Sequence, residues 1–207
     1  MTTTTRVPPV RVPRGEARAR LIEAARSLVR HKGFAATSVD DLCAAAGVTK
    51  GAFFHHFPSK EALGVALVDD WTAMTGAMFA AHPYNLKEDP LDRVFAYIDL
   101  RRALLAQPLP EFSCVAGTTV QEAYESSPPI RAAAERSIRS GFDHVLPHLR
   151  EALAAHPVPG VTAESLAQQF QVATQGGIIL AKALDDPAPA RSAFDHLERY
   201  LRLLFGR

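Results

Sequence analysis

The sequence predicts an all-α protein, and three observations lead to this fold class. Apolar residues recur at the three- and four-residue spacing of a helix along most of the chain. Prolines and glycines divide this pattern into segments of helical length, and no alternating strand pattern appears. Apolar residues make up 47% of the 207-residue chain, which is enough to bury a core. We expect a few short N-terminal helices followed by a larger helical region.

The N-terminal helices have recognisable start and stop signals. An amphipathic helix is expected over residues 14–32, and Gly33 ends it in the left-handed conformation that glycine adopts readily. Ser38 and Asp41 have the spacing of a capping box, in which each side chain accepts a hydrogen bond from the other residue's backbone N–H. We therefore expect a second helix that runs through Ala46.

A tight turn and two further caps follow. Gly47 supplies the turn, Thr49 caps a brief helix, and Pro58 stops it. Ser59 then caps a longer helix. Two short helices joined by such a turn form a helix-turn-helix, whose second helix enters the major groove of DNA. We place this DNA-reading motif at about residues 38–57.

Prolines delimit the remaining helices. These are expected at about residues 90–106, 113–126, 128–155, 162–183 and 188–205. Ser127 followed by Pro128 is a cap with proline at the first helical position. Pro147 falls inside its expected helix, so we predict a kink or a break there.

Charge is distributed unevenly along the chain. Residues 1–60 hold ten Lys or Arg and four Asp or Glu side chains, a net charge of +6, and the remainder has a net charge of −5. A basic end on an acidic body is typical of a module that meets phosphate. We interpret residues 1–13 as a disordered basic tail. The alternative is an arm that contacts phosphate or the minor groove.

Candidate DNA contacts lie at the ends of the motif's helices. Short donors or cations that suit phosphate are Thr37, Ser38, Thr49, His55 and Lys60. In the first turn of the second helix, Lys50 is placed to donate to guanine and Ala52 to touch a thymine methyl group. Gly51 allows close backbone approach. Phe53 and Phe57 are expected in the core instead.

The last two expected helices are apolar on more than one face. A helix of this kind must be buried on more than one side, and a second copy of the chain is the simplest partner. We therefore predict a homodimer with a four-helix interface through about residues 162–205. Gly176-Gly177 costs helix stability but permits close approach, so we expect it to mark the packing point. The alternative is a monomer core with two loosely packed glycines.

The stretch from Thr37 to Lys60, followed by Glu61-Ala62-Leu63, resembles the N-terminal domain of the TetR family of transcriptional repressors (TetR/AcrR type) over about residues 14–64. The segment 113–122 is similar to a Gly-Cys-Leu-x-Gly-x-x-x-x-Glu stretch of one branch of that family. The resemblance implies an all-helical homodimer that binds operator DNA through Lys50, Gly51 and their neighbours. Phe54 stands where the family usually has a tyrosine whose hydroxyl meets a phosphate.

The resemblance also implies a ligand pocket among the middle helices. We thus divide the chain into the tail, a helix-turn-helix DNA-binding domain at residues 14–60, and a ligand-binding and dimerisation domain at residues 61–207. Candidate pocket residues are Trp71, Met74, Met78, Phe95, Ile98, Phe112, Cys114, Thr118, Gln121 and Phe142. This mixture suits a small, fairly hydrophobic ligand. For each residue the alternative is ordinary core packing.

Cys114 has a second interpretation. A thiol in a pocket could be alkylated or oxidised by a reactive electrophile, with the adduct acting as the inducer. Reactivity requires a nearby cation or a helix N-terminus, and the sequence neighbours of Cys114 carry no charge. The other reading is an inert, packed thiol.

Several classes of function find no support in the sequence. No nucleophile-base-acid set and no Gly-rich phosphate loop is present, so we expect no catalytic residues and no cofactor. His144 and His148 have a metal-ligand spacing, but Pro147 lies between them and no third ligand is evident, so no metal site is predicted. Two cysteines make no disulfide framework, and neither a membrane span nor a signal peptide is evident. We expect a cytoplasmic protein without a membrane partner.

These observations predict a ligand-responsive, DNA-binding transcriptional regulator. We expect a homodimeric repressor that binds double-stranded operator DNA and is released by a small-molecule inducer. One alternative is a helical small-molecule-binding protein or enzyme with an incidental helix-turn-helix head, which the charge distribution disfavours. Another is an activator, or a regulator that has no ligand.

Overall fold

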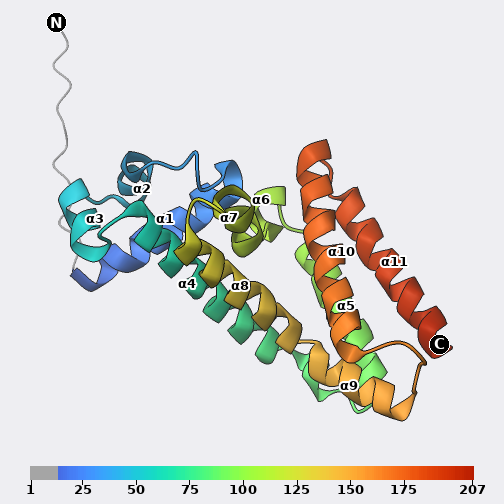
Figure 1. The fold of residues 1–207 in the computed structure, drawn as a ribbon. Coiled ribbons are helices and arrows are strands. Elements are labelled where there is room, and N and C mark those ends of the chain that lie inside the picture. Colours follow the sequence, from blue (N-terminus) through green and yellow to red (C-terminus); the bar gives the residue numbers. More distant parts are fainter. Residues whose placement is uncertain (1–13) are drawn as a thin grey trace, which may run out of the picture.

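The computed structural model describes residues 14–207, and the expected basic tail lies outside the described residues. Every regular element in this part of the chain is a helix, which confirms the all-α prediction (Figure 1). The elements are α1 (Arg14–Lys32), α2 (Val39–Ala46), α3 (Lys50–His56), α4 (Lys60–Ala80), the 3₁₀ helix η1 (Pro83–Leu86), α5 (Pro90–Leu104), α6 (Leu109–Phe112), α7 (Val115–Ala123), α8 (Pro128–Asp143), α9 (Leu146–Ala155), α10 (Ala163–Leu184) and α11 (Ala188–Phe205).

The expected caps hold the short N-terminal helices in place. Ser38 Oγ accepts a hydrogen bond from the Asp41 N–H at 3.1 Å, and Asp41 Oδ2 accepts one from the Ser38 N–H at 2.9 Å. A further hydrogen bond from Lys32 holds the pKa of the Asp41 carboxyl well below its usual range. Gly47 has a φ of +65°, the left-handed turn that joins α2 to α3. The capping box and the turn are therefore confirmed.

The helix boundaries differ from expectation in three places. The helix expected at residues 113–126 is shorter, and α6 forms a separate turn before it. The turn η1 was not anticipated. The helix expected at residues 128–155 is broken: α8 ends at Asp143, and Pro147 lies in the first turn of α9. Proline is tolerated there because the first N–H groups of a helix have no intrahelical acceptor, which confirms the predicted break.

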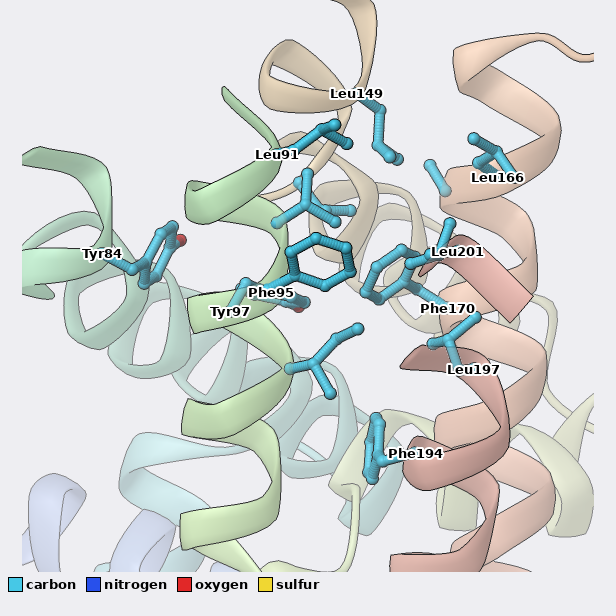
Figure 2. Packing of buried hydrophobic residues seen from close by; sticks show 14 of the residues in the cluster. Tyr84, Leu91, Phe95, Tyr97, Leu149, Leu166, Phe170, Phe194, Leu197 and Leu201 are labelled. Carbon is cyan, nitrogen blue, oxygen red and sulfur yellow. The ribbon is translucent and has the colours of Figure 1, made fainter. Parts of the chain in front are cut away.

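Buried apolar side chains form two clusters. The first packs α1, α2 and α3 against the start of α4 and against α7 and α8, so the core of the N-terminal head continues beyond residue 60. The second lies between α5, α9, α10 and α11, where Tyr97 and Phe170 have ring centroids 5.7 Å apart. Figure 2 shows side chains of α5 extending toward Phe170 and Leu201 across this layer. The head lies at one end of the molecule, and α10 and α11 lie side by side at the other (Figure 1).

The two adjacent glycines of α10 have different surroundings. A Cβ atom added to Gly177 would lie 2.9 Å from the Cα atom of Ala190 in α11, while one added to Gly176 would meet nothing within 4 Å. Gly177 is thus the point of close approach between two helices of the same chain. Gly176 faces outward.

This difference predicts opposite effects of the same substitution. Gly177→Ala should lower the free energy of unfolding by about 1–3 kcal/mol, because the clash is with backbone that must move. Gly176→Ala meets no atom of its own chain, so within the chain it should have no such cost and should gain up to about 1 kcal/mol from helix propensity. Thermal unfolding of the two variants and the wild type measures both effects. Equal melting temperatures for the two variants would contradict the assigned packing.

Candidate nucleic-acid interface and ligand cavity

Six of the predicted DNA contacts are exposed on α3 and at the N-terminal caps of α2 and α3. They are Ser38, Thr49, Lys50, Gly51, Phe54 and His55, and Ala52 beside them is half-buried. These residues lie in the head, at the end of the molecule away from α10 and α11 (Figure 1). The structure therefore brings most of the expected DNA-contacting residues onto one small region.

The hydroxyl groups of Ser38 and Thr49 cap helices as hydrogen-bond acceptors, which leaves their O–H groups available as donors. The oxygen of Ser38 accepts from the Asp41 N–H, and the oxygen of Thr49 accepts from the Ala52 N–H, each at 3.1 Å. A hydroxyl group has one donor besides its acceptor lone pairs. Both side chains can thus cap a helix and donate to a phosphate oxygen at the same time.

Lys50 forms an ion pair within the head. Its Nζ lies 2.7 Å from Asp40 Oδ1, and both side chains are largely exposed. The hydrogen bond and the charge of Asp40 raise the pKa of Lys50, so the ammonium group stays protonated. An exposed pair of this kind is worth little to stability, and Lys50 can exchange Asp40 for a base edge or a phosphate at small cost.

Two other predicted contacts are engaged inside the protein. Thr37 is 1% exposed, and its hydroxyl donates to the Gly33 carbonyl at 2.7 Å. Lys60 Nζ donates to the Ala35 carbonyl at 3.2 Å and lies 4.6 Å from the centroid of the Phe34 ring. Burial lowers the pKa of Lys60. Both side chains therefore support the loop between α1 and α2, Thr37 from a buried position and Lys60 from a half-buried one.

The aromatic residues of α3 divide between core and surface. Phe53 and Phe57 are buried, which confirms their expected place in the core. Phe54 is 54% exposed on the outer face of α3, edge-on to Phe53 at 5.1 Å between ring centroids. A tyrosine hydroxyl at position 54 would therefore project from the same surface as Lys50 and His55.

A cavity of about 90 Å³ lies at the centre of the molecule, bounded by α4, α5, α6, α7, α8, α10 and α11. Its apolar lining includes Trp71, Phe79, Leu104, Phe112, Ile178 and Phe194. Its polar lining includes Thr75, Arg101, His144, Gln171, Thr174 and Gln175. Apolar walls with a few convergent polar groups are typical of small-molecule sites.

The structure places only some of the predicted pocket residues in this cavity. Trp71, Phe112 and Cys114 line it. Residues that lie outside it are Met74, Met78, Phe95, Ile98, Thr118, Gln121 and Phe142. The two methionines are exposed on the outer face of α4, and Phe95 and Ile98 are buried in the second cluster. Thr118 and Gln121 line a separate surface groove between α7 and α10. Helical spacing identified these side chains but not the direction in which each helix face points.

The polar side of the cavity was not anticipated. Gln171, Thr174 and Gln175 have the i, i+3, i+4 spacing of one helix face, inside a helix that is otherwise largely apolar. That polar stripe is the signal from which they could have been found. Arg101 on α5 faces them, and its guanidinium Nη2 donates to Thr174 Oγ1 at 3.3 Å. The cavity thus has a polar wall on α10 and a cation opposite.

Cys114 is the N-cap residue of α7, and its sulfur accepts a hydrogen bond from the Gly117 N–H at 3.3 Å. Both cysteines are free, and Cys43 is buried in the head.

His144 also lines the cavity, where its ring centroid is 4.8 Å from that of Phe79. Burial and then the charge of Arg101 lower the pKa of His144, so its imidazole is neutral.

Polar contacts join the head to the helices that line the cavity. The Arg30 guanidinium donates to the Glu111 carbonyl at 2.8 Å and forms an ion pair with its carboxylate. The Ala35 N–H donates to Glu122 Oε2 at 2.6 Å. Lys182 Nζ donates to the Arg30 carbonyl at 3.4 Å. Helices α6, α7 and α10 are therefore bonded to the head as well as bounding the cavity.

None of the helices in residues 14–207 combines the length and the apolar character that a membrane span requires.

Comparison with known proteins identifies the family. The family model described as bacterial regulatory proteins, tetR family, matches residues 21–67, and the model of the tetracyclin repressor-like C-terminal domain matches residues 90–197. The transcriptional regulator AcuR of Cereibacter sphaeroides is 26% identical over 173 residues, which is 83% of this chain and 79% of AcuR.

Solved structures agree with this result over most of the chain. The crystal structure of a regulatory protein TetR from Rhodobacter sphaeroides has a TM-score of 0.78 at 25% identity and covers 88% of this chain and 97% of that one. A TetR transcriptional regulator from Chloroflexus aurantiacus has a TM-score of 0.76 at 28% identity, with 91% and 95% covered. The protein described here belongs to the TetR family of DNA-binding transcriptional regulators.

Proposed function

We propose that this DNA-binding regulator acts as a homodimeric repressor that a small molecule, bound in the central cavity, releases from its operator. In this proposal residues 14–60 are the DNA-binding domain, and residues 61–207 bind the ligand and the second copy. The observation that carries it is the combination of the exposed, donor-rich surface on α2 and α3 with a cavity whose walls are bonded to the same head.

An exposed apolar face on α10 and α11 supports the dimer. Large apolar side chains on these helices that remain exposed are Val172, Ile179, Leu180, Leu184, Tyr200 and Leu203. The opposite faces of the same helices are packed inside the chain by Phe170, Phe194 and Leu201. Exposed apolar patches of this kind mark interaction sites, and a two-fold axis would pair the patch with itself.

Helix α4 offers a route from ligand to DNA. Trp71, Thr75 and Phe79 on its second half line the cavity, while Leu63 and Leu67 on its first half are buried in the core of the head. A ligand that displaces the cavity wall would tilt α4 and change the spacing of the two heads in the dimer. The two heads of the dimer must bind two DNA half-sites that lie one helical turn apart. A small change in the distance between the heads is therefore enough to release the operator.

Salt-dependent gel shifts on DNA from upstream of the protein's own coding region test the function. We expect affinity to fall steeply with salt, because phosphate contacts release counterions. Lys50→Ala should weaken binding about 10-fold or more, while Asp40→Asn should strengthen it by removing a negative charge and freeing Lys50. Absence of binding at every salt concentration would favour the alternative of a helical ligand-binding protein or enzyme.

Phe54→Tyr should tighten operator binding modestly, by about 2- to 10-fold, because the hydroxyl group would reach a phosphate from the exposed face of α3. Phe54→Leu is the matched control, since it changes the ring but adds no donor. Titrations at matched salt measure the three affinities. Equal affinity of the wild type and Phe54→Tyr would refute the phosphate contact.

Leu180→Glu should convert the dimer to monomers, because a charge would be buried in the proposed apolar interface. Leu86→Glu is the control, since Leu86 is 84% exposed on η1, outside α10 and α11. Sedimentation velocity gives the mass of each variant. A wild-type protein that sediments as a monomer, or a dimeric Leu180→Glu, would exclude this interface.

A further inference from the structure

Arg101 is an uncompensated cation at the wall of the central cavity. It is the only Lys or Arg among the described lining residues, and no Asp or Glu is among them. Its one side-chain hydrogen bond within residues 14–207 goes to the neutral hydroxyl of Thr174 at 3.3 Å. The cavity therefore has a net positive charge and no internal counterion.

Three other arginines, also partly buried, are paired with carboxylates and can be compared with Arg101. Four arginines have a buried Nε without a hydrogen-bond partner: Arg26, Arg30, Arg93 and Arg101. The first three each form an ion pair with a carboxylate, from Asp70, Glu111 and Glu151 respectively. Arg101 forms no ion pair among the described residues. Arg101 therefore differs from the other three arginines because no carboxylate is paired with it.

The surroundings of Arg101 hold its guanidinium in position without neutralising it. The guanidinium carbon lies 5.1 Å from the ring centroid of Phe79 and 5.6 Å from that of Tyr97. These aromatic faces stabilise a cation but supply no acceptor for its N–H groups. His144 across the cavity is neutral, and burial raises the pKa of Tyr97, whose hydroxyl stays protonated. Removing an unpaired charge from water is costly, so a ligand that pairs with it gains that energy on binding.

We propose that Arg101 binds the carboxylate of a small organic monoanion, whose short apolar part lies against Trp71, Leu104 and Phe112. A guanidinium presents N–H donors in a fork that matches the two oxygens of a carboxylate. The polar groups of α10, Gln171, Thr174 and Gln175, are placed around the cavity to orient that head group. The inference names the ligand class of the proposed regulator and rests on that function.

Charge and size both limit the ligand. One cation without a second basic side chain favours a single negative charge over a phosphate monoester, which carries about two. A volume of about 90 Å³ is small beside the roughly 300–1,000 Å³ of drug-sized sites. We therefore expect carboxylates with a short aliphatic chain to fit best.

Thermal unfolding of the full-length protein, without DNA, tests the proposal. Each carboxylate is compared with its neutral amide: acetate with acetamide, propionate with propionamide, and benzoate with benzamide. The melting temperature should rise with at least one carboxylate, in proportion to the logarithm of its concentration, and should not rise with the matching amide. Inorganic phosphate at the same ionic strength should have no such effect.

Substitutions then locate the effect. Arg101→Met should weaken carboxylate binding about 10- to 100-fold, which is the loss of a charge-assisted hydrogen bond. Arg101→Lys should retain part of the affinity, because it keeps the charge but loses the fork. Arg131→Met is the control, since Arg131 is exposed on α8 and does not line the cavity. Calorimetric titration gives the dissociation constants, and Arg101→Lys keeps the test decisive if Arg101→Met does not fold.

Three outcomes would overturn the proposal: equal shifts with a carboxylate and its amide, a shift with phosphate alone, or unchanged carboxylate affinity in folded Arg101→Met or Arg101→Lys. These measurements involve no DNA, so their failure leaves the operator-binding result untouched. A failed gel shift would likewise refute the proposed function and leave carboxylate binding standing.

Discussion

The membership of helix α4 in two hydrophobic cores is the constraint on which the rest of the structure depends. Its first half contributes Leu63, Leu67 and Val68 to the cluster of the head, and its second half contributes Phe79 to the cluster of the body. Packed interiors have few voids and low compressibility, so neither core can absorb a displacement of the helix alone. The cavity lies beside the second half of α4. In the proposed mechanism, a change of shape there reaches the head through α4, whose first half is part of the head's core.

The cavity is the place where this protein departs from ordinary core packing. Elsewhere in the described residues, the partly buried Arg26 and Arg30 are paired with carboxylates, and Gly177 sits where two helices approach closely. Around the cavity, by contrast, a cation lies beside neutral amides, hydroxyl groups and aromatic rings. Such an arrangement costs stability and is typical of functional sites, where local rules of packing are broken for a ligand.

The two halves of the protein differ in how far their features could be predicted. The capping box of Ser38, the left-handed Gly47 and the cap at Thr49 depend on neighbours within a few residues, so their positions follow from local spacing. Thr37 has the same kind of side chain, but its surroundings do not follow from local spacing. Its hydroxyl is bonded to Gly33, and its burial depends on how the loop after α1 folds back. Met74 and Met78 fit the helical pattern of α4 yet lie on its exposed face.

By itself, the sequence determined the all-α class, most helix boundaries, the helix-turn-helix and the basic character of the N-terminal end, because helix periodicity, caps and charge are local properties of the chain. Only the tertiary structure decided which residues form the cavity. Arg101 and Thr174 lie 73 positions apart in the chain and meet because α5 packs against α11, which in turn packs along α10. Periodicity shows that a helix has an apolar or a polar face. Which other helix packs against that face depends on contacts between distant parts of the chain.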